Sequence, residues 1–364
     1  MKNPTLLAFV AAIVITLMLP IPQALKSSIV FVFLGLYIYL KRGYLYVIAA
    51  STRFNKGDEK NLARAWSWYE KGWRAGLAPH YAHMLGNLFV QRGDARVALE
   101  IFNQLIERGE SGRKGYASLV KGVRISRSMA LWVTGKTEEA VEELQEVKAS
   151  GHLDTNLAVN LGSYLLASDR LDEMESLLQD LETMSPQSSG MKDNRGYYLY
   201  RRGDLLQADA LYRSLLSEET PKFPEAYFHA GQVRLALGKC AQACVLFEQA
   251  LEHPFYHTST VSEQEVRSFL DEAQKTKETL GVEDEDDEAQ IHSAIFDDDL
   301  FDDDGPNTEL DEEDEEAEVN IELDDADYAD ENDAEVDDDN EDASSIERVL
   351  YDESDDEDDR ARQP

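Results

Sequence analysis

Cysteine is almost absent from this sequence, which has two cysteines, Cys240 and Cys244, among its 364 residues. A disulfide framework is therefore excluded, and so low a cysteine content fits a reducing compartment. Two histidine pairs have spacings that a helix could direct at a metal ion: His80 with His83, and His253 with His257. Because buried small apolar side chains account for both cysteines, we expect neither a metal site nor a cofactor.

The short sequence motifs that indicate a catalytic site are also missing. The sequence has no glycine-rich phosphate loop, no nucleophile elbow and no zinc-protease motif. Paired carboxylates are abundant only near the C-terminus, where nothing would hold them in place for acid–base chemistry. We therefore expect that the protein is not an enzyme.

Basic residues are scarce in the last part of the chain. Residues 283–364 contain 41 acidic and three basic residues, whereas residues 1–282 are electrically balanced. Repulsion and low apolar content predict a disordered tail over residues 281–364. Short apolar islands such as Ile295–Phe296 and Ile346–Tyr351 could order on a partner, or the tail could be a repelling brush. A calcium loop at residues 302–305 is excluded because its first ligand position is Leu300.

Two apolar runs open the chain, Leu6–Leu19 and Ile29–Leu40. Each approaches the length that crosses a bilayer once flanking residues are included, so residues 1–50 predict a hairpin of two membrane spans. A cleaved signal peptide is the rival interpretation. Pro20, Pro22 and Gln23 stand where its small-residue cleavage site would be needed, which favours the hairpin.

The flanking charges predict how this hairpin is oriented. The connecting loop has only Lys26, whereas Lys41, Arg42 and further basic residues follow the second run. The positive-inside rule then places both termini on the cytoplasmic side of a cell membrane, with tyrosines near residue 41 as an interfacial belt.

A repeat follows the apolar runs. Three positions recur in one register: a turn residue, a small or flexible apolar residue five places later, and a large apolar residue four places after that. The turn residues are Gly93, Gly135, Asp169, Gly203 and Gly238. The corresponding pairs are Ala98 with Phe102, Ala140 with Leu144, Met174 with Leu178, Ala208 with Tyr212, and Ala243 with Phe247. Successive spacings are 42, 34, 34 and 35 residues. Upstream, Gly86, Gly162, Gly196 and Gly231 occupy one equivalent place.

This pattern resembles the tetratricopeptide repeat, W-x2-L-G-x2-Y followed by A-x3-F and P over 34 residues. The resemblance implies an all-α solenoid of helix–turn–helix units. A glycine in the first helix lets the second helix approach, and the residues of the Ala-x3-Phe pair lie on one face of the second helix. The second unit departs from the pattern with Ser128 in place of glycine, and about eight extra residues precede it near residues 109–115.

The resemblance divides the chain into regions. Residues 79–257 are expected to form five units and residues 258–280 a capping helix. Residues 51–78 contain Ala65 and Tyr69, another pair of the same spacing, and are expected to form a partial unit or connector. Its first helix would be Tyr44–Phe54, continuing out of the membrane.

In this family the first helices line a concave face. Aligning the repeats in the same register assigns eleven residues of this sequence to that face. They are His83, Asn87, Ile125, Met129, Trp132, Val159, Ser163, Tyr197, Tyr200, Phe228 and Gln232. The face would be aromatic and apolar with few charges, which suits an extended or helical peptide, and we expect about half of these residues to be exposed. The basic residues of the family's carboxylate clamp are missing.

A second candidate surface is basic. It comprises Arg113, Lys114, Lys121, Arg124 and Arg127. A solvated helix surface explains these residues, but they could also bind anionic lipid or the protein's own tail.

These observations favour a non-catalytic, membrane-anchored scaffold, in a bacterial membrane, that recruits partner proteins through the concave face. The tail would regulate or add to this binding. Two alternatives stay open: a tail that binds basic proteins as a nucleic-acid mimic, and an envelope-assembly factor with its repeats outside the cytoplasm. No direct contact with nucleic acid is expected.

Overall fold

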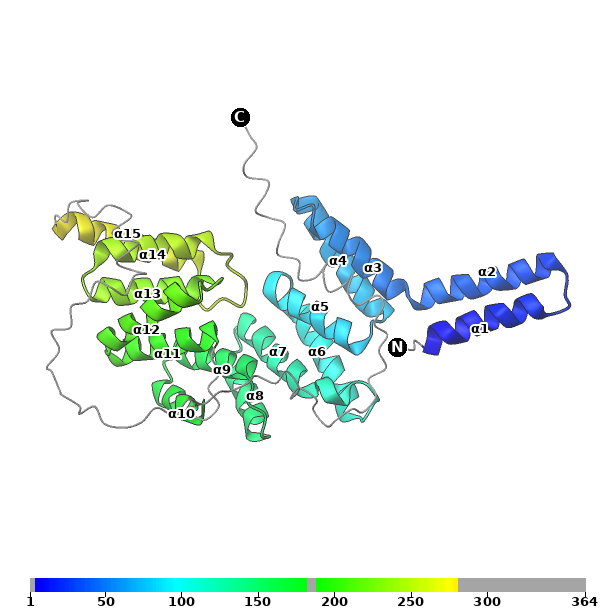
Figure 1. Cartoon of the computed structure of the whole chain (residues 1–364), viewed down its shortest axis with the longest axis horizontal. Coiled ribbons are helices and arrows are strands. Elements are labelled where there is room, and N and C mark those ends of the chain that lie inside the picture. Colours follow the sequence, from blue (N-terminus) through cyan, green and yellow to red (C-terminus); the bar gives the residue numbers. More distant parts are fainter. Residues whose placement is uncertain (1–3, 182–187, 281–364) are drawn as a thin grey trace, which may run out of the picture.

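The computed structural model describes residues 4–181 and 188–280, so the acidic tail, predicted to be disordered, lies outside the described residues. Within those ranges the regular structure is helical and contains no strand, which confirms the all-α class. Figure 1 shows a hairpin of two helices projecting from one end of a curved array of helix pairs.

The N-terminal part consists of α1 (Pro4–Met18), α2 (Gln23–Leu40), α3 (Arg42–Phe54) and α4 (Glu59–Ala75). Five pairs follow: α5 (Pro79–Arg92) with α6 (Ala95–Glu110), α7 (Val120–Val133) with α8 (Thr137–Ala149), α9 (Thr155–Ala167) with α10 (Leu171–Leu181), α11 (Ser189–Arg202) with α12 (Leu205–Glu218), and α13 (Pro224–Ala236) with α14 (Cys240–Glu252). A last helix, α15 (Glu263–Leu280), covers the end of the array. The extra residues before α7 form a loop and a 3-10 turn, η1 (Ala117–Leu119).

Three of the five helix pairs close because a glycine of the first helix, Gly86, Gly196 or Gly231, lies against a ring of the second. A Cβ added to Gly86 would lie 2.4 Å from the Phe102 ring, and one added to Gly231 would lie 2.5 Å from the Phe247 ring. Phe102 and Phe247 are fully buried. The recurring glycine and the aromatic of the Ala-x3-Phe pair are therefore two halves of one packing contact.

The turns between paired helices follow the expected register, with one difference. Gly135, Gly203 and Gly238 have positive φ, and Asp169 adopts the same left-handed region at φ 57°. Gly93 has φ −115°, and a Cβ there would lie 2.8 Å from Trp66. Glycine is required at residue 93 for space rather than for backbone conformation.

Neighbouring first helices pack side by side, α5 on α7, α7 on α9, α9 on α11 and α11 on α13. They form one layer of the array, and the second helices form the other (Figure 1). The layers enclose a nearly continuous apolar core. At its C-terminal end Val266 and Ala273 of α15 are fully buried and Phe269 packs on Phe228.

The α1–α2 hairpin has its apolar side chains on the outside. Phe9 of α1 packs against Phe33 and Tyr37 of α2, and Lys26 donates a hydrogen bond to the Leu17 carbonyl at the end of α1. By length and composition α2 is long and apolar enough to cross a membrane, whereas the apolar helix Leu6–Met18 is shorter.

Helices α3 and α4 form a further tightly packed pair. A Cβ added to Gly43 would lie 2.2 Å from the Gly76 carbonyl oxygen, and the Ser51 and Tyr69 hydroxyls are 2.9 Å apart in the interior. Trp66 of α4 then packs on Phe89 of α5, which joins this pair to the array.

Candidate functional site

The inner face formed by the first helices is the candidate site, and its aromatic half lies on α7, α9, α11 and α13. The ring of Trp132 stacks on that of Tyr164 with centroids 4.5 Å apart and planes at 8°. Tyr197 stacks on His229 at 3.9 Å and on Tyr200 at 5.8 Å. Trp132, Tyr197 and Tyr200 are half-buried, so each keeps part of its ring available to a ligand.

A buried polar cluster holds the Tyr197 side of this face. The His229 ring Nδ1 lies 2.9 Å from the Asp193 carboxylate, and the Tyr212 hydroxyl donates to Asp193 at 3.0 Å. Burial and the nearby Asp193 carboxylate raise the pKa of Tyr212, so its hydroxyl stays a donor. Because Asp193 accepts from two elements, the His229 ring under Tyr197 has a fixed orientation.

Arg201 fixes the other side of Tyr197. Its guanidinium lies 5.6 Å from the Tyr197 ring centroid and forms an ion pair with Asp169, in the turn after α9, at 2.7 Å. The same group donates to the Leu166 carbonyl. Tyr197 is thus placed between His229 of α13 and Arg201 of its own helix, and Arg201 is in turn tied to the end of α9 and to the turn between α9 and α10.

The face also carries neutral polar side chains. The His83 Nε2 atom lies 2.7 Å from the Ser126 hydroxyl, and burial together with the nearby His80 lowers the pKa of His83 to about 4, so its ring is neutral at physiological pH. The amide oxygens of Asn87 and Gln232 are buried and have no hydrogen-bond partner among the described residues. Both follow a first-helix glycine, at opposite ends of the array.

The structure places the eleven predicted face residues in two groups. Eight are half-buried: His83, Asn87, Met129, Trp132, Val159, Ser163, Tyr197 and Tyr200. Three are buried, namely Ile125, Phe228 and Gln232. The expectation that about half would be exposed is wrong, because neighbouring first helices cover these side chains and α15 covers Phe228.

Sequence reasoning missed several residues that build the face. Tyr164, Asp193, Arg201 and His229 were not predicted as residues of the face. His229 lies 36 residues after Asp193, about one repeat length. That spacing is the available signal, since residues one repeat apart lie on adjacent first helices.

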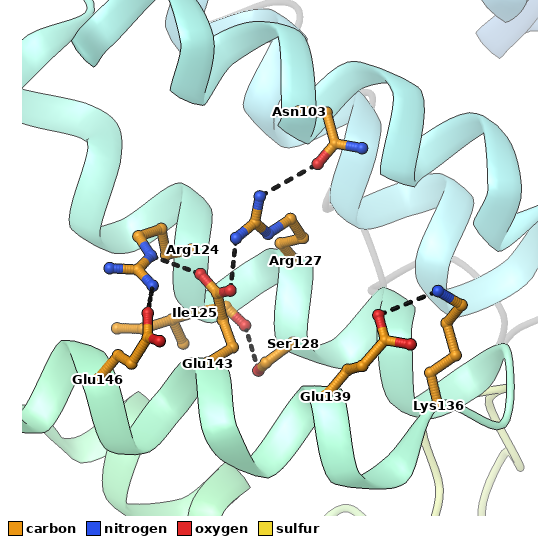
Figure 2. Close-up of polar contacts among 9 residues, drawn as sticks. All are labelled: Asn103, Arg124, Ile125, Arg127, Ser128, Lys136, Glu139, Glu143 and Glu146. Atoms are coloured by element: carbon orange, nitrogen blue, oxygen red, sulfur yellow. Dashed lines mark hydrogen bonds and ion pairs between the residues drawn. The ribbon is translucent and has the colours of Figure 1, made fainter.

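The predicted basic surface is divided. Arg124 and Arg127 both pair with Glu143, whose side chain is 8% exposed, and Arg124 also pairs with Glu146 at 2.5 Å (Figure 2). Arg127 donates to Asn103 of α6 as well. Arg113, Lys114 and Lys121 are exposed, in the loop before η1 and at the start of α7. Two of the five basic residues therefore join helices to one another.

The two ends of the array meet. The loop after α14 reaches the end of α5, where the Tyr256 hydroxyl accepts from Arg92 at 2.8 Å and the His257 amide donates to the Gln91 carbonyl at 2.9 Å. The same loop is tied to α13, since the Thr260 amide donates to Glu225. The first and last units of the array are thereby joined.

The described residues contain no group of three or more His, Cys, Asp and Glu side chains placed for a metal ion. Cys240 and Cys244 are buried free thiols, and burial raises the pKa of Cys244. His253 stacks on Tyr227 at 4.8 Å. The two cysteines fill the interior of the last unit, and His253 lies half-buried at its edge.

A family model agrees with this architecture. The family model of the tetratricopeptide repeat matches residues 194–255, from α11 to the end of α14. A thermophilic tetratricopeptide-repeat protein of Thermus thermophilus shares 18% identity at a TM-score of 0.42, over 54% of this chain and 100% of that one. The TPR2AB domain of yeast Sti1 in complex with pHSP90 shares 15% identity at a TM-score of 0.26, over 64% of this chain and 98% of that one. No curated protein matches the chain. The fold is an α-solenoid with repeats of the tetratricopeptide type.

Proposed function

We propose that this protein is a non-catalytic scaffold, anchored in a membrane by α1 and α2, that binds a peptide segment of a partner protein on the inner face of its repeats. The observation that carries the proposal is the row of half-buried rings, Trp132, Tyr197 and Tyr200, held in place by stacking. Rigid aromatic side chains lose little conformational entropy on binding and are the commonest anchors at protein interfaces.

The face also suggests what kind of peptide it accepts. Its rings lie on adjacent helices beside half-buried apolar Val159 and Met129, His83 is neutral, and Arg201 is already paired with Asp169. The amide oxygens of Asn87 and Gln232 could accept from a peptide main chain after a small rotation. A segment with apolar or aromatic side chains and little charge fits this arrangement best.

The membrane anchor is supported by where apolar side chains are exposed. Among the described residues every large, strongly exposed hydrophobic side chain lies between Leu6 and Ile48, except Leu206. An apolar surface concentrated in this way is stable only when a lipid bilayer or a partner protein covers it. The basic residues after Leu40 favour a cytoplasmic position for the repeats.

Peptide selection on the purified full-length chain, followed by affinity measurements, tests the binding face. Trp132→Ala and Tyr197→Ala should each lower the affinity for the selected peptides by about 30-fold, which is the effect of losing an interface anchor. Leu206→Ala is the matched control, because it removes an exposed apolar side chain from a second helix, α12. Equal binding by all three variants would show that the inner face is not the binding surface.

Deleting residues 283–364 separates this proposal from a tail-driven function. The scaffold keeps its peptide binding without the tail, whereas a protein that acts through its polyanionic tail loses its partners. Protease treatment of intact cells tests orientation, since a cytoplasmic tail is protected and an external tail is digested.

A further inference from the structure

The α3–α4 pair brings basic residues from two separate parts of the sequence to the junction with α2. Gly43, at the start of α3, contacts Gly72 and Gly76 at the end of α4. The two helices are antiparallel, so Lys71 and Arg74 of α4 lie at the level of Lys41 and Arg42. We call these four basic residues the collar.

The collar cations lie against aromatic rings or reach solvent. Arg42 lies 3.9 Å from the Tyr39 ring centroid and donates to the Tyr39 carbonyl. Lys41 lies 5.2 Å from the Tyr44 ring. Tyr39 itself is 58% exposed, at the end of the helix that the anchor proposal places in the bilayer. Basic and aromatic side chains at this position match the headgroup region of a membrane.

Trp68 extends the aromatic part of this surface. Its ring packs edge-on against Tyr46 of α3, and the cations of Arg53 and Lys71 lie 4.4 and 5.8 Å from its centroid. Leu45 and Ile48, on the adjoining side of α3, are about half exposed. The apolar surface of the hairpin therefore continues onto α3 next to an aromatic and basic surface.

Little negative charge opposes the collar. Residues 1–80 contain three acidic residues, Asp58, Glu59 and Glu70. Asp58 and Glu59 lie at the far end of the pair, where Asp58 caps α4. Glu70 pairs with Arg74 at 2.5 Å, a contact in which Arg74 stays 64% exposed. The collar thus has an excess of about three positive charges.

Helix C-termini attract basic residues for a simpler reason, since Arg74 and Lys41 complement the dipoles of α4 and α2. That effect does not account for Lys71 beside Trp68, nor for the clustering of two helix ends at the exit of an apolar hairpin.

From this juxtaposition we propose that the collar of Lys41, Arg42, Lys71 and Arg74 binds the headgroups of anionic phospholipids and so orients the repeat array on the bilayer. The inference rests on the proposed membrane anchor. Each basic residue near an anionic surface strengthens its attraction by about fivefold at physiological salt, and less at high salt.

Reconstitution of the full-length protein tests the collar. Vesicles of phosphatidylcholine receive an equal fraction of brominated phosphatidylglycerol or brominated phosphatidylcholine, and quenching of tryptophan fluorescence gives the relative affinity for the anionic lipid. The Trp68→Phe variant identifies the contribution of Trp68. In wild-type protein the brominated phosphatidylglycerol should quench Trp68 more strongly, and 1 M salt should reduce the difference.

The matched variants have the same change in charge. Lys71→Gln with Arg74→Gln should lower the relative affinity for phosphatidylglycerol at least about fivefold. Lys56→Gln with Lys60→Gln, at the far end of the α3–α4 pair, should leave it near the wild-type value. Equal affinities for both lipids in the wild type, or equal losses in both double variants, would overturn the proposal.

Alkaline carbonate extraction of the same vesicles separates this inference from the anchor. Protein that stays in the vesicles but shows no preference for the anionic lipid refutes the collar alone. Protein that is released refutes the anchor, and the collar with it.

Discussion

Gly231→Ala should destabilise the last repeat, although alanine normally favours a helix over glycine. A Cβ at residue 231 would lie 2.5 Å from Cε1 of Phe247 and 2.7 Å from its Cδ1. Phe247 is fully buried, and its ring centroid lies 5.8 Å from that of Phe228 and 5.9 Å from that of Phe269. Restoring ordinary contact needs a shift of about 1 Å in a core that is already close-packed.

Two opposing effects determine how much Gly231→Ala changes the free energy of unfolding. Overpacking a core costs about 1–3 kcal/mol, whereas replacing glycine with alanine inside a helix contributes about 1 kcal/mol of stability. The net loss should be about 1 kcal/mol, and up to about 2 kcal/mol. Gly122→Ala in α7 is the control, because its Cβ would meet only His83, at 3.8 Å. That change should stabilise the protein by up to about 1 kcal/mol.

The second unit supplies a rescue. It has Ser128 in place of the glycine and Leu144 in place of the ring, so a smaller partner accepts a larger first-helix residue. Gly231→Ser combined with Phe247→Leu should therefore cost less than the sum of the two single changes, by at least about 1 kcal/mol.

Urea unfolding followed by circular dichroism measures these differences on the full-length protein in detergent, and hydrogen exchange of α13 and α14 locates them. Repeat arrays open unit by unit, so the local measurement is the decisive one. A Gly231→Ala protein with wild-type exchange in both helices would refute the proposed packing contact.

Three further predictions follow from the polar contacts. Between pH 7.5 and 5 His83 binds a proton in the unfolded chain but stays neutral in the folded protein, because its folded pKa is about 4 against the ordinary 6.5. The wild type should therefore lose about 2 kcal/mol more stability than His83→Gln over this interval, as measured by urea unfolding at the two pH values. Glu143→Gln should cost about 2 kcal/mol because two partly buried arginines lose their shared partner, whereas Glu146→Gln, at an exposed position, should cost less than about 1 kcal/mol by the same assay. Tyr256→Ala should open the contact between the two ends of the array, raising hydrogen exchange near Arg92 while leaving exchange in the central helices unchanged.

The helix pairs could be predicted from the sequence because each is set by a local steric rule. Glycine in the first helix and a large side chain of the Ala-x3-Phe pair in the second are found about 16 residues apart in each unit that has both, and the structure places Gly86 against Phe102 in this way. Such contacts depend on residues within one unit, so a fixed spacing reveals them.

Exposure on the inner face could not be predicted in the same way. The register gives the side of a first helix on which a residue lies, but not how closely the neighbouring unit covers it. Phe228 occupies a face position by register and is 1% exposed, because Phe269 of the capping helix packs on its ring. That contact joins elements outside the repeating pattern.

Contacts between distant units depend on how much the array curves. Arg92 and Tyr256 are 164 residues apart and meet only because the array of units between them curves back toward its start. Small rotations at each interface add up to this curvature, and each rotation reflects packing that a motif does not encode. The sequence therefore revealed the units but not the closure.

The same reasoning explains why the α1–α2 hairpin and the candidate face are mechanically connected. α3 follows α2 with only Lys41 between them, α4 packs along α3, and Trp66 of α4 packs on Phe89 of α5. The Tyr44 hydroxyl of α3 also accepts from the Ala78 amide just before α5. Since α2 and α3 are joined by one residue and the later steps are packed contacts, the orientation of α2 limits the orientation of α5, and the closed array extends this limit to the rings on α11. On the proposed function, a scaffold built in this way would present the candidate face at a defined height and angle above the membrane, instead of sampling a volume around a flexible tether.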